Sequence, residues 1–165
     1  MTEMEQILQP AMACLRLSML DEANDEIESL PPESKADKVV NGIQALIYMG
    51  TGSWQLMREV SGFLTHEWPA ESQHWIWLAY ATRRCRSITE ARQILTKAVE
   101  LHPTEPMIQF NLACYAAQTG DLGIARERLS QAITLDPGAR LLALDDPDLM
   151  PLWNELGKSS PTFDP

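Results

Sequence analysis

Three prolines recur at a fixed interval and interrupt runs of helix-forming sequence. Pro69, Pro103 and Pro137 lie 34 residues apart (103 − 69 = 34; 137 − 103 = 34), and each follows a run rich in helix-forming residues. Proline has no backbone N–H for the helical hydrogen-bond ladder, so it ends a helix. A fixed interval in this size range is typical of repeat architectures, in which each repeat is one supersecondary unit.

Small residues keep the same register against these prolines. Ala45, Ala79 and Ala113 each lie 24 residues before a proline, and Gly52 and Gly120 lie 17 before. A small side chain where two helices cross lets their backbones approach closely, and glycine accepts the left-handed turn that ends a helix. Each repeat is therefore expected to be a helix, a tight turn and an antiparallel helix. Such pairs bury their apolar faces by stacking on their neighbours.

The pattern resembles the tetratricopeptide repeat, a helix pair of 34 residues. In the repeat at 70–103 the matching residues are Trp75, Leu78, Ala79, Ala91, Leu95, Ala98 and Pro103. In the repeat at 104–137 they are Leu112, Ala113, Gly120, Ala125, Leu129, Ala132 and Pro137. Trp75 and Gln109 share one further position, 28 residues before a proline.

The resemblance implies an all-α fold, an α-solenoid of about four repeats within a single domain over residues 1–157. The repeats are expected at about 4–35, 36–69, 70–103 and 104–137, and the first two are degenerate. In the second repeat Gln44, Met57 and Ser61 depart from the pattern.

Prolines also mark the first repeat. Pro10 falls inside its first helix, so that helix either begins near Gln9 or is kinked there, because proline is tolerated in a first helical turn. Pro31 and Pro32 end the repeat. Ser34, with Asp37 three residues later, is interpreted as the start of the next helix.

One more helix is expected at 146–157, as a cap over the last apolar face of the stack. Asp146 is a suitable N-cap, Pro147 suits the first helical position, and Gly157 ends the helix. Its apolar stripe comprises Leu149, Leu152, Trp153 and Leu156. Residues 158–165 are expected to form a flexible tail.

Charge and composition argue against several classes of function. The net charge of −10 opposes binding to nucleic acid and to anionic membranes. The sequence starts without the basic and apolar regions of a secretory signal, and the longest strongly apolar run, 75–81, is too short to span a bilayer. A cytoplasmic, bacterial protein whose three cysteines are reduced is therefore expected.

The sequence shows none of the motifs that carry catalysis. The three histidines lack zinc-protease spacing, and there is no CxxC pair, GxSxG elbow or glycine-rich phosphate loop. The acidic run DDPD lacks the glycine turn of a calcium loop. We therefore expect no enzyme activity and no catalytic, cofactor or metal site.

The resemblance implies that the first helices of the repeats line a concave groove that binds partners. The groove residues implied in this chain are Gln73, Ile76, Trp77, Tyr80, Arg83, Arg84, Met107, Phe110, Asn111 and Gln118. Trp, Tyr and Arg anchor many interfaces, although the same aromatic residues could instead pack as core. The cations of the family's carboxylate clamp, which holds chaperone tails, are missing from the corresponding positions.

The expected function is that of a non-catalytic adaptor that binds an apolar or amphipathic segment of a protein or peptide partner. Two alternatives remain: a small bacterial chaperone of the type III translocator kind, and a self-associating structural subunit. Either a monomer or a homodimer fits the sequence.

Overall fold

The computed structural model describes residues 3–158, and every regular element in that range is a helix. The chain forms two compact units, Met1–Arg86 and Ser87–Pro165, here called the N-terminal and C-terminal units and described separately. A single domain over 1–157 stays a prediction. The expected tail lies outside the described residues from position 159 onward.

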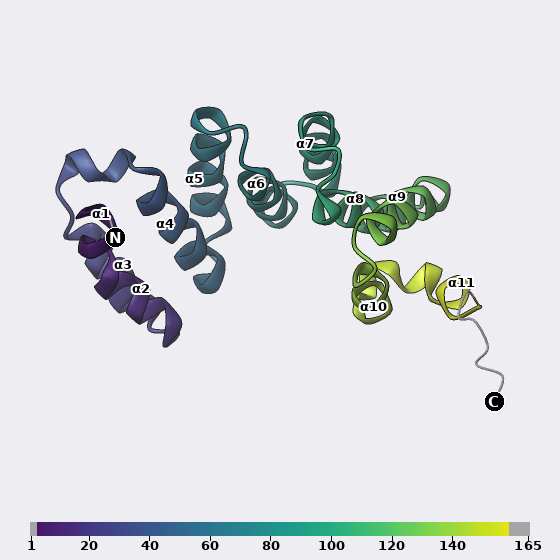
Figure 1. The fold of residues 1–165 in the computed structure, drawn as a ribbon, viewed down its shortest axis with the longest axis horizontal. Coiled ribbons are helices and arrows are strands. Elements are labelled where there is room, and N and C mark those ends of the chain that lie inside the picture. The colour runs from purple at the N-terminus through teal and green to yellow at the C-terminus, as the bar shows by residue number, and fades with distance from the viewer. Residues whose placement is uncertain (1–2, 159–165) are drawn as a thin grey trace. The chain divides into compact units, whose positions relative to one another are not determined.

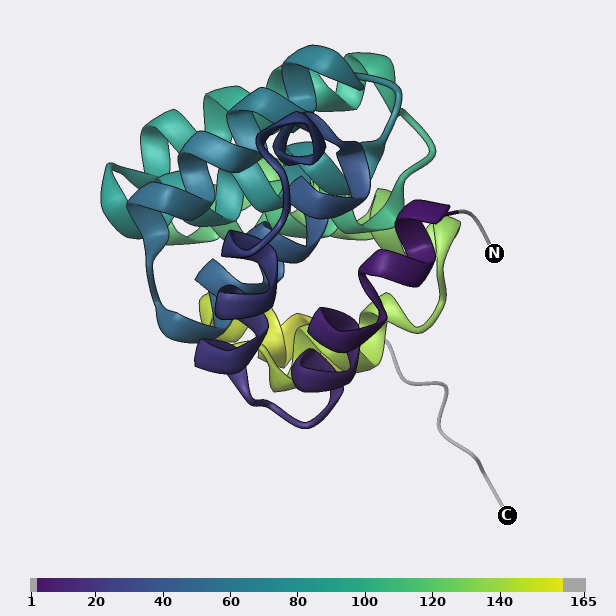
Figure 2. The same cartoon turned by 90° about the vertical axis from the view of Figure 1, so that its left-hand side faces the viewer.

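The N-terminal unit consists of two helix pairs and a further helix. Helices α2 and α3 form the first pair, α4 and α5 form the second, and α6 packs on α5; Figures 1 and 2 show α2 beside α3. The elements are α1 (Glu3–Ile7), α2 (Gln9–Arg16), α3 (Leu20–Glu28), the 3-10 helix η1 (Pro32–Ala36), α4 (Lys38–Thr51), α5 (Trp54–Glu67) and α6 (Ser72–Cys85).

The C-terminal unit is built around the pair α8 and α9. Helix α7 packs on α8, and the chain after α9 returns to lie against α8. The elements are α7 (Ile88–Leu101), α8 (Pro106–Gln118), α9 (Leu122–Leu135), α10 (Ala139–Asp145), the 3-10 helix η2 (Pro147–Leu152) and α11 (Trp153–Lys158).

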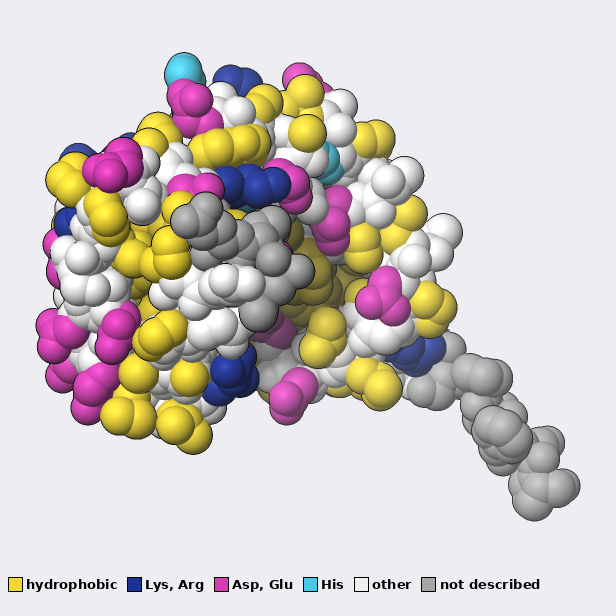
Figure 3. All heavy atoms as spheres, turned by 60° about the vertical axis from the view of Figure 1, so that its left-hand side comes forward, with side chains coloured by type: hydrophobic (Ala, Val, Ile, Leu, Met, Phe, Trp, Pro, Cys, Tyr) yellow, Lys and Arg dark blue, Asp and Glu magenta, His cyan; other side chains and the backbone are white. Residues whose placement is uncertain are grey.

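Acidic and apolar side chains share the surface. On the face drawn in Figure 3, hydrophobic side chains are interspersed with Asp and Glu side chains. The large hydrophobic residues that are exposed include Leu17 in the N-terminal unit and Leu141 in the C-terminal unit. Exposed apolar residues scattered in this way are ordinary on a folded protein.

The residues that recur with the prolines act as the sequence predicts. Helices α5, α7 and α9 end at Glu67, Leu101 and Leu135, each two residues before its proline. Gly52, at the end of α4, and Gly120, in the turn between α8 and α9, have φ angles of 70° and 84°, in the left-handed region. The alanines 24 residues before each proline, Ala45, Ala79 and Ala113, are all 0% exposed.

A hydrogen bond that was not foreseen recurs at the position shared by Trp75 and Gln109. Trp75 Nε1 donates to the Pro69 carbonyl at 3.0 Å, and Gln109 Nε2 donates to the Pro103 carbonyl at 3.4 Å. In the preceding repeat Asn41 Nδ2 donates to the Lys35 carbonyl at 2.9 Å. Each donor is buried and reaches the carbonyl six residues earlier. Three different side chains thus satisfy the same backbone acceptor at the entrance to a helix.

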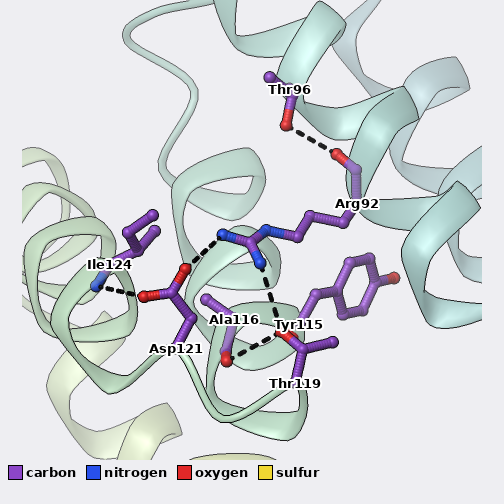
Figure 4. A network of polar contacts seen from close by, with 7 residues as sticks. All are labelled: Arg92, Thr96, Tyr115, Ala116, Thr119, Asp121 and Ile124. Carbon is purple, nitrogen blue, oxygen red and sulfur yellow. Dashed lines mark hydrogen bonds and ion pairs between the residues drawn. The ribbon is translucent and has the colours of Figure 1, made fainter.

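An arginine joins α7 to the turn between α8 and α9 (Figure 4). Arg92 Nη2 lies 3.0 Å from Asp121 Oδ2, and Arg92 Nη1 donates to Thr119 Oγ1 at 3.3 Å. Asp121 is also the N-cap of α9, because its Oδ1 accepts from the Ile124 N–H at 3.5 Å. The Asp121 carboxylate therefore begins α9 and also anchors α7.

The degenerate repeats differ in detail from the predictions. Helix α2 begins at Gln9 with Pro10 in its first turn, which selects the first of the two alternatives for this proline. The expected helix start at Ser34 was wrong: Ser34 lies in η1, and the N-cap of α4 is Asp37, which accepts from the Val39 N–H at 2.7 Å. The two prolines before Ser34 favour the 3-10 turn, since they fix φ and provide no N–H.

The C-terminal cap forms in two pieces rather than as one helix. Asp146 does serve as N-cap, accepting from the Asp148 N–H at 2.9 Å, and Pro147 is the first residue of the element it caps. That element is the 3-10 helix η2, and α-helical geometry resumes at Trp153. Pro151 lies inside η2 and cannot donate to a continuous α-helical ladder.

Two glycines of the C-terminal unit should respond oppositely to substitution by alanine. A Cβ atom at Gly120 or Gly123 meets nothing within 4 Å. The two substitutions therefore differ only in the backbone conformation that alanine must adopt. Gly120→Ala should lower the free energy of unfolding by about 1–2 kcal/mol, because alanine is strained at positive φ. Gly123→Ala, within α9, should raise it by about 0.5–1 kcal/mol. Urea denaturation of both variants checks this, and equal effects would contradict the left-handed turn.

Candidate functional site

Helix α6 carries the groove residues expected in the N-terminal unit. Gln73 and Arg84 are exposed, while the four others are half-buried: Ile76, Trp77, Tyr80 and Arg83. Trp77 lies beside His74 with ring centroids 6.0 Å apart, and His74 is itself buried with Nδ1 3.3 Å from the Trp68 carbonyl. Trp77 and Tyr80 are therefore partly packed against the protein and partly exposed to solvent. They fit both the partner-binding and the core-packing interpretation of the sequence.

One arginine and two aromatic rings form the most organised part of this surface. The Arg84 guanidinium carbon lies 4.9 Å from the centroid of Trp54 and 4.6 Å from that of Tyr80. The two rings meet edge to face, with centroids 5.6 Å apart and planes at 74°. Arg84 Nη2 also donates to the Tyr80 hydroxyl at 2.8 Å. We call Trp54, Tyr80 and Arg84 the arginine–aromatic cluster.

This geometry fixes a flexible side chain in place. A guanidinium has five N–H donors, and stacking on two rings holds its plane while leaving its edge available to acceptors. The cluster therefore offers a preorganised donor beside apolar ring surface.

Trp54 was not among the predicted site residues. It is the first residue of α5, a second helix of its repeat, whereas the groove pattern covers first helices alone. Trp54 and Arg84 belong to different repeats, so no local sequence motif links them. The edge of the N-terminal unit where α5 begins and α6 ends brings the two together, because the helices pack side by side.

An ion pair lies at the other end of α6. Lys38 Nζ donates to Glu71 Oε1 at 3.0 Å and thereby connects the start of α4 to the residue that precedes α6. The hydrogen bond and the charge of Lys38 hold the pKa of Glu71 below its ordinary value. Both side chains are largely exposed, so this pair adds little to stability.

In the C-terminal unit the expected groove residues lie on α8 in different environments. Met107 is exposed, Asn111 is half-buried, and Phe110 is buried at 4% exposure, so this aromatic belongs to the core. Gln118 Nε2 donates to the Asp148 carbonyl of η2 at 3.1 Å. The last turn of α8 is therefore already in contact with the C-terminal part of the same chain.

A cysteine and two aspartates also meet where η2 begins. The ligand atoms of Cys114, Asp146 and Asp148 lie within 4.8 Å of one another. Asp146 Oδ1 accepts from the Asp148 N–H, and Asp146 Oδ2 lies 3.7 Å from Cys114 Sγ, in the position of an acceptor. Capping of η2 accounts for this arrangement, because an N-cap carboxylate satisfies backbone donors at a helix start.

A cavity of about 340 Å³ lies between α9 and the elements that follow it, α10, η2 and α11. Leu129, Ile133, Leu152 and Leu156 provide apolar walls, and Arg126 and Arg140 line its edge. Both arginines are engaged: Arg126 pairs with Glu155 at 2.7 Å, and Arg140 donates to the Leu156 carbonyl. Among the described residues, no helix is long and apolar enough to cross a membrane.

Comparison with known proteins places the fold. No family model and no curated protein matches the sequence. Among solved structures, MamA from Desulfovibrio magneticus RS-1 superposes with a TM-score of 0.73 at 16% identity, covering 82% of this chain and 77% of that chain. TTC0263, a thermophilic TPR protein of Thermus thermophilus, gives a TM-score of 0.72 at 18% identity, covering 94% of this chain and 84% of that one.

The fold is that of a tetratricopeptide-repeat solenoid. The predicted all-α class and the predicted resemblance are thereby confirmed. Identities this low establish the fold alone.

The arginine–aromatic cluster should show measurable coupling. In a double-mutant cycle of Trp54→Leu with Arg84→Gln, we expect an interaction energy of about 0.5–1 kcal/mol, as for exposed cation–π contacts. The free energies of unfolding are measured in urea. The matched cycle replaces Arg86, which is exposed and two residues further along, and should give a coupling near zero. Equal coupling in the two cycles would show that the stacking contributes nothing specific.

Proposed function

We propose that the protein is a non-catalytic interaction module that binds an apolar or amphipathic segment of a partner protein. The observation that carries the proposal is the arginine–aromatic cluster, in which an exposed arginine is held between Trp54 and Tyr80. Interface hot spots are enriched in these three residue types. Rigid aromatic side chains also lose little conformational entropy on binding.

The surroundings of the cluster favour an apolar partner with one acceptor group. Ile76 and Trp77 expose part of their side chains on the same helix, and Gln73 is exposed near its start. An apolar segment would cover these side chains, and a carboxylate or carbonyl of the segment would accept from Arg84. The three cysteines are free thiols, which fits the proposed cytoplasmic location.

Binding rather than catalysis is also supported by the chemistry of this surface. The cluster itself presents a guanidinium, a phenol and an indole, which recognise a partner through hydrogen bonds and stacking. His74, the histidine on α6, lies 3.3 Å from the Trp68 carbonyl through Nδ1 and is buried. Its position fits a structural role at the start of the helix.

The test compares two double variants of the full chain. Tyr80→Ala/Arg84→Ala removes the cluster, and Gln55→Ala/Arg86→Ala changes exposed residues outside it. Partners captured by the wild type from native lysate are identified, and their affinities for each purified variant are then measured by calorimetry. We expect the cluster variant to bind at least about 30-fold more weakly, the effect of losing a hot spot of about 2 kcal/mol. The control variant should bind like the wild type.

Circular dichroism and urea denaturation first establish that both variants are folded. Undiminished affinity in a folded cluster variant would exclude this surface as the docking site and would overturn the proposal.

A further inference from the structure

The last two turns of the face of α8 that the repeat pattern assigns to partners contact the chain's own C-terminal segment, residues 146–157, while Met107 at the start of that face is exposed. Helix η2 packs on α8 within the C-terminal unit. Gln118, one of the expected groove residues, donates to the Asp148 carbonyl at 3.1 Å. Cys114, one turn earlier on α8, approaches Asp146 Oδ2 at 3.7 Å. The segment thus makes the contacts expected of a bound peptide.

Two leucines anchor the segment. Leu149 and Leu152 are 0% and 1% exposed, while Met150 between them is exposed at 60%. The anchors lie three residues apart, so one turn of η2 directs both inward. Asp146 lies three residues before the first anchor and caps the turn that presents them. The segment therefore reads as an acidic cap followed by Leu-x-x-Leu.

The far end of the segment is held by polar contacts with α10 and α9: Trp153 Nε1 donates to the Ala143 carbonyl at 2.8 Å, and Arg140 donates to the Leu156 carbonyl. The ion pair of Arg126 and Glu155 is bidentate, with N–O distances of 2.7 and 2.8 Å, but both side chains are about half exposed. Exposed pairs of this kind contribute little net stability. Beneath Leu152 and Leu156 the contact with α9 leaves the cavity of about 340 Å³ unfilled. The void means that fewer apolar contacts would be lost if this end of the segment opened locally.

We propose that residues 146–157 act as an internal ligand of α8, displaced by a partner segment of the same chemistry. The partner is a peptide that carries an acidic helix cap followed by two leucines three residues apart. This inference rests on the proposed function in treating α8 as a docking surface, but it concerns residues separate from the arginine–aromatic cluster. The need for opening lowers the apparent affinity for the partner in proportion to the fraction of molecules that are open.

The probe is a fluorescein-labelled peptide with the sequence of residues 145–157, DDPDLMPLWNELG. Its binding to the full-length protein is followed by fluorescence anisotropy. In Leu149→Ala one anchor of the internal ligand is lost, so the probe should bind at least about 30-fold more tightly than to the wild type, the low end of the effect of a Leu→Ala change in a core. Met150→Ala is the matched control and should bind like the wild type. A probe with serine at both leucine positions should not bind.

A disulfide provides the opposite test. Asp146→Cys places a second thiol close to Cys114, where the present contact is 3.7 Å. After oxidation, with the Cys114 linkage verified by peptide mapping, probe binding should fall at least tenfold and return on reduction. Asp146→Ser retains an N-cap and forms no linkage, so it should not respond to oxidant.

Two results would overturn the inference: equal probe binding by the locked and reduced forms, or no gain in Leu149→Ala. Circular dichroism checks the fold of that variant. If it is unfolded, Glu155→Gln replaces it and should bind the probe a few-fold more tightly, since it removes the exposed ion pair. The probe is the chain's own segment, so a negative result leaves the arginine–aromatic cluster untouched. Loss of partner binding in the cluster variant is a separate outcome.

Discussion

The close approach of helices at alanine is the constraint on which the rest of the structure depends. Ala45, Ala79 and Ala113 are completely buried, so a larger side chain at any of them would have to be fitted into a closely packed interior. The three alanines recur with the prolines, one on each of the first helices α4, α6 and α8. The helices of these repeats are nearly equal in length: α4, α5, α6, α7 and α9 each have 14 residues, and α8 has 13.

The sequence predicts the features that depend on backbone geometry and misses those that depend on which side chain meets a given acceptor. Proline and glycine act locally, so their spacing correctly located the helix ends and the left-handed turns. The donors to the carbonyl six residues earlier could not be recognised, because Asn41, Trp75 and Gln109 share no chemistry except an N–H group. A repeat can therefore preserve an interaction while its residues change. In the second repeat an interaction is missing altogether: the buried Oγ of Ser61 has no hydrogen-bond partner among the described residues.

The candidate site was predicted in part for the same reason. Tyr80 and Arg84 lie on a first helix and were found from the repeat pattern, whereas Trp54 belongs to a second helix of the preceding repeat. Stacking of Arg84 on two rings requires α5 and α6 to be adjacent, and adjacency of helices is a tertiary property. Phe110 shows the converse: its position in the pattern implied contact with a partner, and its burial assigns it to the core.

A stack of helix pairs must end, and the way in which this one ends explains why its terminal segment resembles a ligand. The last pair presents to the C-terminal segment a face that, in the repeats before it, would pack against another helix or bind a partner. Whatever covers that face must supply apolar anchors at helical spacing and satisfy the exposed polar groups at the end of α8. Leu149 and Leu152 supply the anchors, and the Asp148 carbonyl satisfies Gln118. A peptide that binds this face must meet the same requirements. The cap and a bound peptide therefore need the same features: apolar side chains at helical spacing and an acceptor for Gln118. Pro151 keeps the cap from becoming a continuous α-helix, and a cavity remains between the cap and α9. The cap is therefore sufficient to shield the face, and its incomplete packing allows a better-fitting segment to replace it.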